Sequence, residues 1–333
     1  MENSLISRRA LLASSALTTF DCVVQAQQLV NSSTWPKRTI KIVVNGSPGS
    51  TGDMAARILA EALSQKFKQS FIVDNRPGAN GMLGSEFVAR QAPDGYTLLF
   101  TYTAALLVNP VIYDNFKYDP VKDFAAIAQV GSLATLLVVG NHLPVRNVVE
   151  FVSYLKSRAA SPPSYGSWGI GSGGHLSMEA LLQGYRQTMV HVPYRTLHAA
   201  AMDLASGRLD SAFLPPGAAL PLLEKGQVRA IAITGTNRSK EFPDVKTLSE
   251  QGVTFDLIAW YGLFAPTGTH SYIVNKLNAE VRHVSGLPEL QDRWRRLGFS
   301  EMPSRSSEEF ATLVRNDSRD WGDFVRKLHI KAE

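Results

Sequence analysis

The chain has very little cysteine: Cys22 is the only one among its 333 residues. A single cysteine excludes an intramolecular disulfide and any CxxC metal or redox site. No stretch reaches the ~18 consecutive apolar residues that a membrane-spanning helix needs. No block of lysine and arginine is long enough to indicate a nucleic-acid-binding arm. The densest basic stretch, 293–296, falls in a helical pattern and is interpreted as a solvated face.

Charge of either sign is also modest. With 34 basic and 29 acidic residues the formal charge is +5, and 44% of the residues are hydrophobic. This composition predicts a packed globular protein, and at about 150 residues per domain the length predicts two domains. A mildly positive chain does not repel anionic solutes, so its charge permits an anionic ligand without identifying one.

Residues 1–26 have the pattern of an export signal. Arg8 and Arg9 precede a short apolar run, and compact residues at the cleavage positions predict processing after Ala26. The arginine pair also fits a twin-arginine signal, but we favour the general secretory route, in which paired arginines are common. A lipid anchor on Cys22 is disfavoured because the three residues before it are not small and apolar. We therefore expect a mature protein in the periplasm.

From residue 35 onward, short β-branched runs alternate with stretches of helical period, the arrangement of an α/β protein. The predicted strands are 39–44, 71–74, 97–100, 133–139, 164–168, 189–192, 211–213 and 229–234. The predicted helices are 53–67, 84–91, 148–158, 176–185, 199–206, 217–224, 272–284, 288–297 and 307–328. The strand, glycine-rich loop and helix of residues 39–67 recur at 164–185, which suggests one such unit in each of two domains.

Two glycine-rich loops, 45–52 and 169–174, carry the strongest chemical signal. A helix N-terminus has unpaired N–H groups and a positive dipole end, and glycine lets a ligand approach that backbone. Each loop therefore predicts a seat for an anionic group, although such loops also simply turn the chain, with Asp53 as an N-cap. The predicted ligand-binding residues here are Asn45, Gly46, Ser47, Ser50, Thr51 and Asp53 in the first loop and Gly171, Ser172, Gly173 and His175 in the second.

Other chemistries fit these residues less well. Residues 169–174 match GxGxxG, but the next strand lacks the acidic residue of a dinucleotide-binding fold. Neither loop has the Gly-Lys-Ser/Thr ending of a Walker A loop. A secreted serine hydrolase using Ser172 and His175 remains an alternative, although Ser172 is not in a G-x-S-x-G elbow and no orienting acid is evident. The seven histidines show no compact metal-ligand spacing, so we expect no metal.

A series of motifs in one order indicates a family. They are Trp35-Pro36, 42–53, Asn75-Arg76-Pro77-Gly78-Ala79, 92–97, 118–120, 122–124, 169–176, Val192-Pro193-Tyr194 and 260–266. On these residues the chain resembles the Bug-type substrate-binding receptors of tripartite tricarboxylate transporters, the TctC family, over residues 35–330.

The resemblance implies an α/β fold of the type II periplasmic-binding-protein class, with two lobes around a ligand cleft. It implies that lobe 1 comprises residues 35–138 and 256–333 and lobe 2 residues 139–255, with crossings near Val138 and Phe255. The two glycine-rich loops would face each other across the cleft and bind carboxylate groups. Thr103, Trp168 and Tyr194 complete the predicted ligand-binding set, with Tyr194 either lining the cleft or capping its strand.

The resemblance also implies a non-enzymatic receptor that captures a small organic carboxylate and delivers it to membrane permease subunits, or feeds a sensor kinase. We expect no cofactor and no nucleic-acid partner, and we expect a monomer. Leu214 stands where many relatives have an aspartate, which favours a plain or aromatic carboxylate over an amino acid. The first loop lacks the family's usual aromatic residue, whereas Trp168 and Ile170 add bulk to the second. Trp260 and Tyr261 are interpreted as packing residues.

Overall fold

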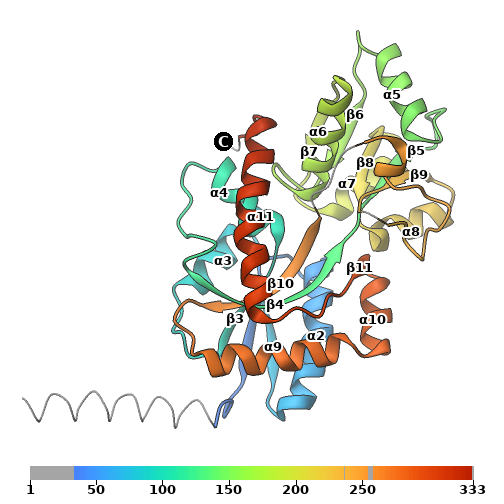
Figure 1. Ribbon diagram of the computed structural model, residues 1–333. Coiled ribbons are helices and arrows are strands. Elements are labelled where there is room, and N and C mark those ends of the chain that lie inside the picture. Colours follow the sequence, from blue (N-terminus) through green and yellow to red (C-terminus); the bar gives the residue numbers. More distant parts are fainter. Residues whose placement is uncertain (1–33, 236, 254–257, 332–333) are drawn as a thin grey trace, which may run out of the picture.

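The computed structural model describes residues 34–235, 237–253 and 258–331 as a mixed α/β protein with two sheets (Figure 1). The first sheet has the strand order β11-β4-β10-β3-β1-β2, and the second has the order β7-β6-β8-β5-β9. Each sheet has its own helices, so the molecule forms two lobes that lie side by side in Figure 1. This is the two-lobed α/β architecture that the sequence predicts.

Lobe 1 is built on the first sheet. Its strands are β1 (Ile40–Val44), β2 (Phe71–Asn75), β3 (Thr97–Tyr102), β4 (Phe124–Leu133), β10 (Ala259–Pro266) and β11 (Phe299–Glu301). Its helices are α2 (Thr51–Phe67), α3 (Met82–Ala89), α4 (Asn109–Ile112), α9 (Ser271–Ser285), α10 (Pro288–Arg295) and α11 (Ser307–Lys327), with a 3₁₀ turn η1 (Ala79–Gly81) and a π-helical turn η2 (Ala104–Val108). β1 pairs in parallel with β2 and β3, whereas β10 runs antiparallel to β3 and β4.

Lobe 2 is built on the second sheet. Its strands are β5 (Leu136–Gly140), β6 (Ser164–Ser167), β7 (Val190–Pro193), β8 (Ser211–Leu214) and β9 (Val228–Ile233). Its helices are α5 (Val148–Ser157), α6 (Gly173–Tyr185), α7 (Leu197–Ala205) and α8 (Pro216–Glu224), followed by the 3₁₀ turn η3 (Ser249–Gln251). The parallel pairing of β6 with β7 and β8 places the loop after β6 at a carboxyl edge of this sheet, as the β1 loop is in lobe 1.

The chain passes from lobe 1 to lobe 2 between β4 and β5. β4 ends in the first sheet at Leu133, and β5 pairs with β8 and β9 in the second sheet from Leu136. The predicted crossing near Val138 therefore lies inside a strand of the second sheet, and we propose residues 134–135 in its place. The predicted return near Phe255 lies outside the described residues.

Apolar side chains cover both faces of the first sheet. On one face, α2, α9 and α10 pack Leu59, Leu277 and Trp294 against the sheet. On the other face, α3, η2 and α11 contribute a second buried cluster that includes Phe310. The apolar positions of α2 that recur with helical period, Ala55, Ile58, Leu59 and Ala62, are buried, which is why this sequence forms a helix against the sheet.

The sequence patterns missed three strands, β4, β10 and β11. β4 reads FAAIAQVGSL, whose alanines and glycine have low strand propensity. It forms because it lies between β10 and β11 in the sheet, where tertiary pairing outweighs local preference. This strand matters for function because it leads directly into the crossing between the lobes.

Gly262 of β10 offers a test of this packing. A methyl group added there would lie 2.5 Å from Phe310 Cζ and 2.9 Å from Phe264 Cε2. Overpacking of this kind costs about 1–3 kcal/mol, so Gly262→Ala should lower the free energy of unfolding by that amount in urea denaturation. Gly184→Ala is the control, because nothing lies within 4 Å of its added methyl in α6, and helix propensity predicts a small gain of about 0.5–1 kcal/mol. Equal stabilities for the two variants would contradict the packing described here.

Candidate functional site

The two glycine-rich loops lead into the N-termini of α2 and α6, and the structure shows the same cap at both. In α2, Ser50 is the N-cap: its Oγ accepts a hydrogen bond from Asp53 N at 3.3 Å. The Asp53 carboxylate in turn accepts from Gly49 N at 2.9 Å. Asp53 is thus the third helical residue, not the N-cap that the sequence suggested.

In α6, Ser172 takes the place of Ser50. Its Oγ accepts from His175 N at 3.4 Å, and the His175 ring accepts from Gly171 N through Nδ1 at 3.0 Å. The glycine before each serine has a left-handed backbone, with φ of 79° at Gly49 and 74° at Gly171. The segments Gly49–Asp53 and Gly171–His175 are therefore one structural motif used twice, with an acceptor side chain at the third helical residue.

This cap leaves the same two backbone donors unused in each helix. Thr51 N and Gly52 N in α2, and Gly173 N and Gly174 N in α6, have no acceptor among the described residues. Such N–H groups lie at the positive end of the helix dipole, which favours an anion. The structure thus supplies one pair of free donors in each lobe.

The two caps differ in charge. Burial acts to raise the pKa of Asp53, but hydrogen bonds from Arg57, Gly49 N and Asn75 outweigh it, so the pKa is lowered and the carboxylate stays ionised. Burial lowers the pKa of His175 to about 3, and the neighbouring His191 ring contributes to this shift. A neutral His175 is required here because its Nδ1 accepts a hydrogen bond.

A stack of rings holds His175 against the second sheet. The His175 and His191 rings lie 4.0 Å apart and 7° from parallel, and His191 stacks on Tyr165 at 4.8 Å. His191 Nε2 lies 2.7 Å from Ser167 Oγ at the end of β6, and burial lowers the pKa of His191 to about 4. Sequence analysis did not assign His191 a role, since its neighbours in the stack come from other strands and helices.

Several predicted ligand-binding side chains have partners inside their own lobe. Asn45 Nδ2 donates to Thr101 and Ser85, and the Thr103 hydroxyl clamps β10 by accepting from Trp260 N and donating to Trp260 O. The Tyr194 hydroxyl donates to Asp203 of α7 at 2.7 Å. Gly46 O accepts from Asn75, whereas Ser47 is exposed. These contacts position the loops, whereas the Ser47 side chain remains exposed to solvent or ligand.

The second loop touches lobe 1 directly. A methyl group on Gly171 would collide with Ile112 of α4 and lie 3.5 Å from Val108. Leu176, in the first turn of α6, is buried in the same apolar cluster as Val108 and Ile112. This loop therefore meets the π-helical turn η2 and α4 of lobe 1.

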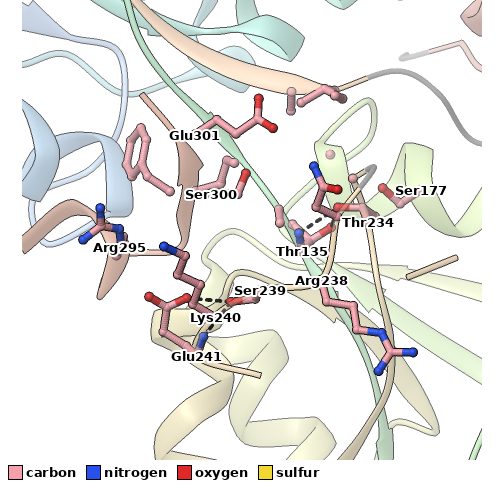
Figure 2. Close-up of a pocket in the computed structure, with 18 of the residues that line it drawn as sticks. Thr135, Ser177, Thr234, Arg238, Ser239, Lys240, Glu241, Arg295, Ser300 and Glu301 are labelled. Carbon is pink, nitrogen blue, oxygen red and sulfur yellow. Dashed lines mark hydrogen bonds between the residues drawn. The ribbon is translucent and has the colours of Figure 1, made fainter. Parts of the chain in front are cut away.

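A cavity of about 250 Å³ lies beside the crossing between the lobes (Figure 2). Among the predicted residues only Gly173 lines it; the crossing contributes Thr135, and the segment after β9 contributes Thr234 and Arg238. Thr234 Oγ1 accepts from Thr135 N at 2.8 Å and joins the strands at the cavity wall. Sequence analysis missed this cavity because its lining comes from segments far apart in the chain.

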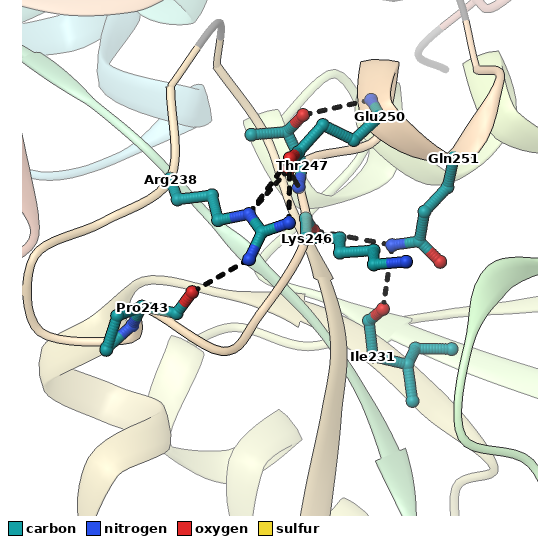
Figure 3. A network of polar contacts seen from close by, with 7 residues as sticks. All are labelled: Ile231, Arg238, Pro243, Lys246, Thr247, Glu250 and Gln251. Atoms are coloured by element: carbon teal, nitrogen blue, oxygen red, sulfur yellow. Dashed lines mark hydrogen bonds and ion pairs between the residues drawn. The ribbon is translucent and has the colours of Figure 1, made fainter.

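A polar network fixes one side of this cavity (Figure 3). The Arg238 guanidinium donates to both oxygens of Glu250 at 2.9 Å and to Pro243 O at 3.1 Å. Hydrogen bonds from Arg238 and from Thr247 lower the pKa of Glu250 to about 2. Gln251 Nε2 donates to Ile231 O, so the segment that follows β9 is tied back onto that strand.

The hydrolase alternative does not fit this geometry. Ser172 is fully buried and its Oγ serves as the N-cap, while His175 Nδ1 accepts from Gly171 N. Within residues 34–235, 237–253 and 258–331, no group of His, Cys, Asp and Glu side chains could hold a metal ion. Over the same residues, no helix is both long enough and apolar enough to span a membrane.

Comparison with proteins of known structure reveals relatives with bound ligands. R. palustris Rpa4515 with adipate is 31% identical with a TM-score of 0.83, covering 89% of this chain and 99% of that one. MatC from Rhodopseudomonas palustris with bound malate is 31% identical with a TM-score of 0.78, covering 87% of this chain and 100% of that one. The ligands bound in these two relatives, adipate and malate, are both carboxylates.

Comparison of sequences also finds relatives that match most of the chain. Protein BugT of Bordetella pertussis is 31% identical over 306 residues, which cover 91% of this chain and 93% of BugT. The model of the tripartite tricarboxylate transporter family receptor, TctC, matches residues 55–330. This chain therefore belongs to the tripartite tricarboxylate transporter receptor family, whose members are solute-binding receptors and not enzymes.

Proposed function

We propose that this protein is an extracytoplasmic receptor that holds a small organic carboxylate between its two lobes and delivers it to permease subunits of a tripartite transporter. Residues 1–26 act as the cleaved export signal, which places the mature monomer in the periplasm. The N-termini of α2 and α6 each bind one anionic group, and no cofactor takes part.

The observation that carries this proposal is the repeated cap. Two helices in different lobes, α2 and α6, begin with the same serine N-cap. Each has the same two free N–H groups in its first turn. Free donors at N1 and N2 are general at helix N-termini, but these two caps also share a left-handed glycine before the serine and lie one in each lobe. Relatives at 31% identity contain adipate and malate, which are dicarboxylates, and one carboxylate for each helix suits such ligands.

The number of available donors is sufficient for specific binding. A hydrogen bond to a charged group contributes about 1.5–3 kcal/mol net. Three or four such bonds offset the loss of translational and rotational freedom and leave an affinity in the micromolar range. Because each lobe supplies only half of the donors, a ligand that contacts both stabilises the closed arrangement of the lobes.

The contact between Gly171 and Ile112 supports closure of the lobes at this loop. Gly171 has a left-handed backbone and no room for a side chain against lobe 1. The chain passes between the lobes at residues 134–135, so rotation there would move the α6 N-terminus relative to α2. A ligand that bridges the two caps would hold the lobes in this position.

Substitution by proline tests the backbone donors directly. Proline is tolerated at the first helical position, where it removes only an unpaired N–H group. The preceding residues already have the extended backbone that proline requires, with ψ of 160° at Ser50 and 157° at Ser172. We expect Thr51→Pro and Gly173→Pro each to weaken binding of a dicarboxylate such as adipate at least about tenfold in calorimetric titration, the loss of one charge-assisted hydrogen bond.

The matched controls are Thr51→Ala and Gly173→Ala, which change the side chain but keep the N–H group. They should bind within about threefold of the wild-type protein, and the thermal midpoints of the proline variants should stay close to those of the alanine variants. Proline and alanine variants that bind carboxylates equally well would show that these N–H groups do not contact the ligand. A protein that binds no carboxylate in a thermal-shift screen would contradict the proposed function itself.

Acid should weaken the α6 cap. His175 is neutral in the folded protein, with a pKa of about 3, whereas the unfolded chain binds a proton near the ordinary value of 6.5. Because the unfolded state binds more protons between these values, stability falls as pH drops from 6.5 towards 3. Urea unfolding at pH 7 and pH 5 should show the wild-type protein losing roughly 1–2 kcal/mol more than His175→Asn, whose amide oxygen keeps an acceptor without titrating. Parallel losses in the two proteins would mean that His175 does not carry this dependence.

A further inference from the structure

The Trp168 ring packs against the first turn of α6, beside Gly173 and Gly174, whose N–H groups are free. A methyl group on Gly174 would lie 2.6 Å from Trp168 Cζ3, and one on Gly173 would lie 3.5 Å from Cζ2. The indole thus contacts the two residues whose N–H groups are unpaired, and glycine at position 174 is what allows this approach. Trp168 is half-buried, so part of its ring remains accessible.

Tyr261 occupies the matching position on α2. Its Cε1 would lie 3.0 Å from a methyl group on Gly52, the residue that corresponds to Gly174 in the repeated cap. Phe100 stacks on the Tyr261 ring at 5.6 Å and 26°, and Phe299 packs against it at 5.5 Å, which fixes its orientation. The Tyr261 ring is half-buried among these neighbours.

A chain of contacts joins the two rings through the interface between the lobes. Tyr261 lies 5.7 Å from Tyr102, and the Tyr102 hydroxyl donates to Asn80 Oδ1 at 2.9 Å. Asn80 Nδ2 is 3.6 Å from the position of a methyl group on Gly171, three residues after Trp168. One aromatic ring is therefore present at each cap, and Tyr261 is linked through Tyr102 to Asn80, which lies close to Gly171 of the second loop.

We propose that Trp168 and Tyr261 are specificity-determining residues that select carboxylates with a flat, apolar carbon skeleton, the class of benzoate, over short hydroxylated dicarboxylates. This inference rests on the proposed function, because it assumes that a carboxylate binds at the free N–H groups of the caps. In an aromatic carboxylate the ring is attached directly to the carboxylate carbon. A carboxylate held by Gly173 N and Gly174 N would therefore bring its ring beside the Trp168 indole.

The selectivity follows from what each skeleton would contact. An aromatic ring gains offset or edge contacts with the indole or phenol, worth about three- to tenfold in affinity for each pair. A hydroxylated skeleton such as that of malate, bound at α6, would place a hydroxyl against the face of the Trp168 indole, which has an N–H donor but no acceptor. An unpaired hydroxyl is costly to bury. The neutral His175 cap beside Trp168 also presents no buried carboxylate, in contrast to Asp53 beside Tyr261. The single carboxylate of the ligand is accordingly expected at α6.

Calorimetric titration of the purified protein with benzoate, adipate and malate tests the inference. We expect the wild-type protein to bind benzoate at least about tenfold more tightly than malate. Trp168→Ala should weaken benzoate binding about tenfold and change adipate binding less than about threefold. Trp168→Phe keeps a ring and should restore most of the benzoate affinity, which a purely structural role for the indole would not predict.

Substitutions of Tyr261 and the tryptophan fluorescence of the protein provide two further tests. Tyr261→Phe keeps the ring and should retain the preference for benzoate, whereas Tyr261→Leu should reduce it; the thermal midpoint of each variant shows that it is folded. Benzoate should also change the tryptophan emission of the wild-type protein, and that change should be lost in Trp168→Phe.

The outcomes separate this inference from the proposed function. Tighter binding of adipate or malate than of benzoate, or an equal loss for all three ligands in Trp168→Ala, would overturn the selectivity and leave the receptor function intact. Failure of all three to bind, while the protein remains folded, would overturn both.

Discussion

The structure depends on one interaction that occurs twice: a side chain at the third residue of a helix accepts a hydrogen bond from the glycine N–H that precedes the N-cap serine. In lobe 1 the acceptor is Asp53, and in lobe 2 it is His175. This bond holds the left-handed glycine before each cap, and the first two helical N–H groups have no acceptor among the described residues. The proposed carboxylate recognition and selectivity, and the expected acid sensitivity, are all based on this arrangement.

The use of different acceptors gives the two lobes different electrostatic character. Asp53 is ionised and held by Arg57 and Asn75, so its cap contains a charge that is compensated within lobe 1. His175 is neutral and stacked on His191, so its cap has the helix dipole without a carboxylate nearby. A fully charged ligand group is therefore better placed at α6, and a ligand with one carboxylate has a defined orientation between the lobes.

Local sequence patterns predicted the strand, loop and helix units well because their signals are contiguous. The β-branched run before residue 45 and the helical period after Asp53 both form the expected elements, and the echo at 164–185 forms the corresponding unit in lobe 2. Strand β4 was missed because its alanines and glycine give it little intrinsic preference, and sheet neighbours distant in sequence stabilise it. The N-cap of α2 was assigned to Asp53, whereas the structure shows that it is Ser50. Both residue types are good N-caps, and only backbone geometry distinguishes them.

The ring stack, the cavity at the crossing and the role of Tyr261 required the three-dimensional structure. His191 meets His175 only because β7 lies beside β6, and Tyr261 reaches Gly52 from a strand two hundred residues later in the chain. A crystal structure of the protein with a bound carboxylate tests the central claim most directly. The account predicts carboxylate oxygens within about 3.2 Å of Gly173 N or Gly174 N, beside the Trp168 ring. A ligand seated instead in the cavity lined by Thr135 and Arg238, with both helix caps free of ligand, would contradict it.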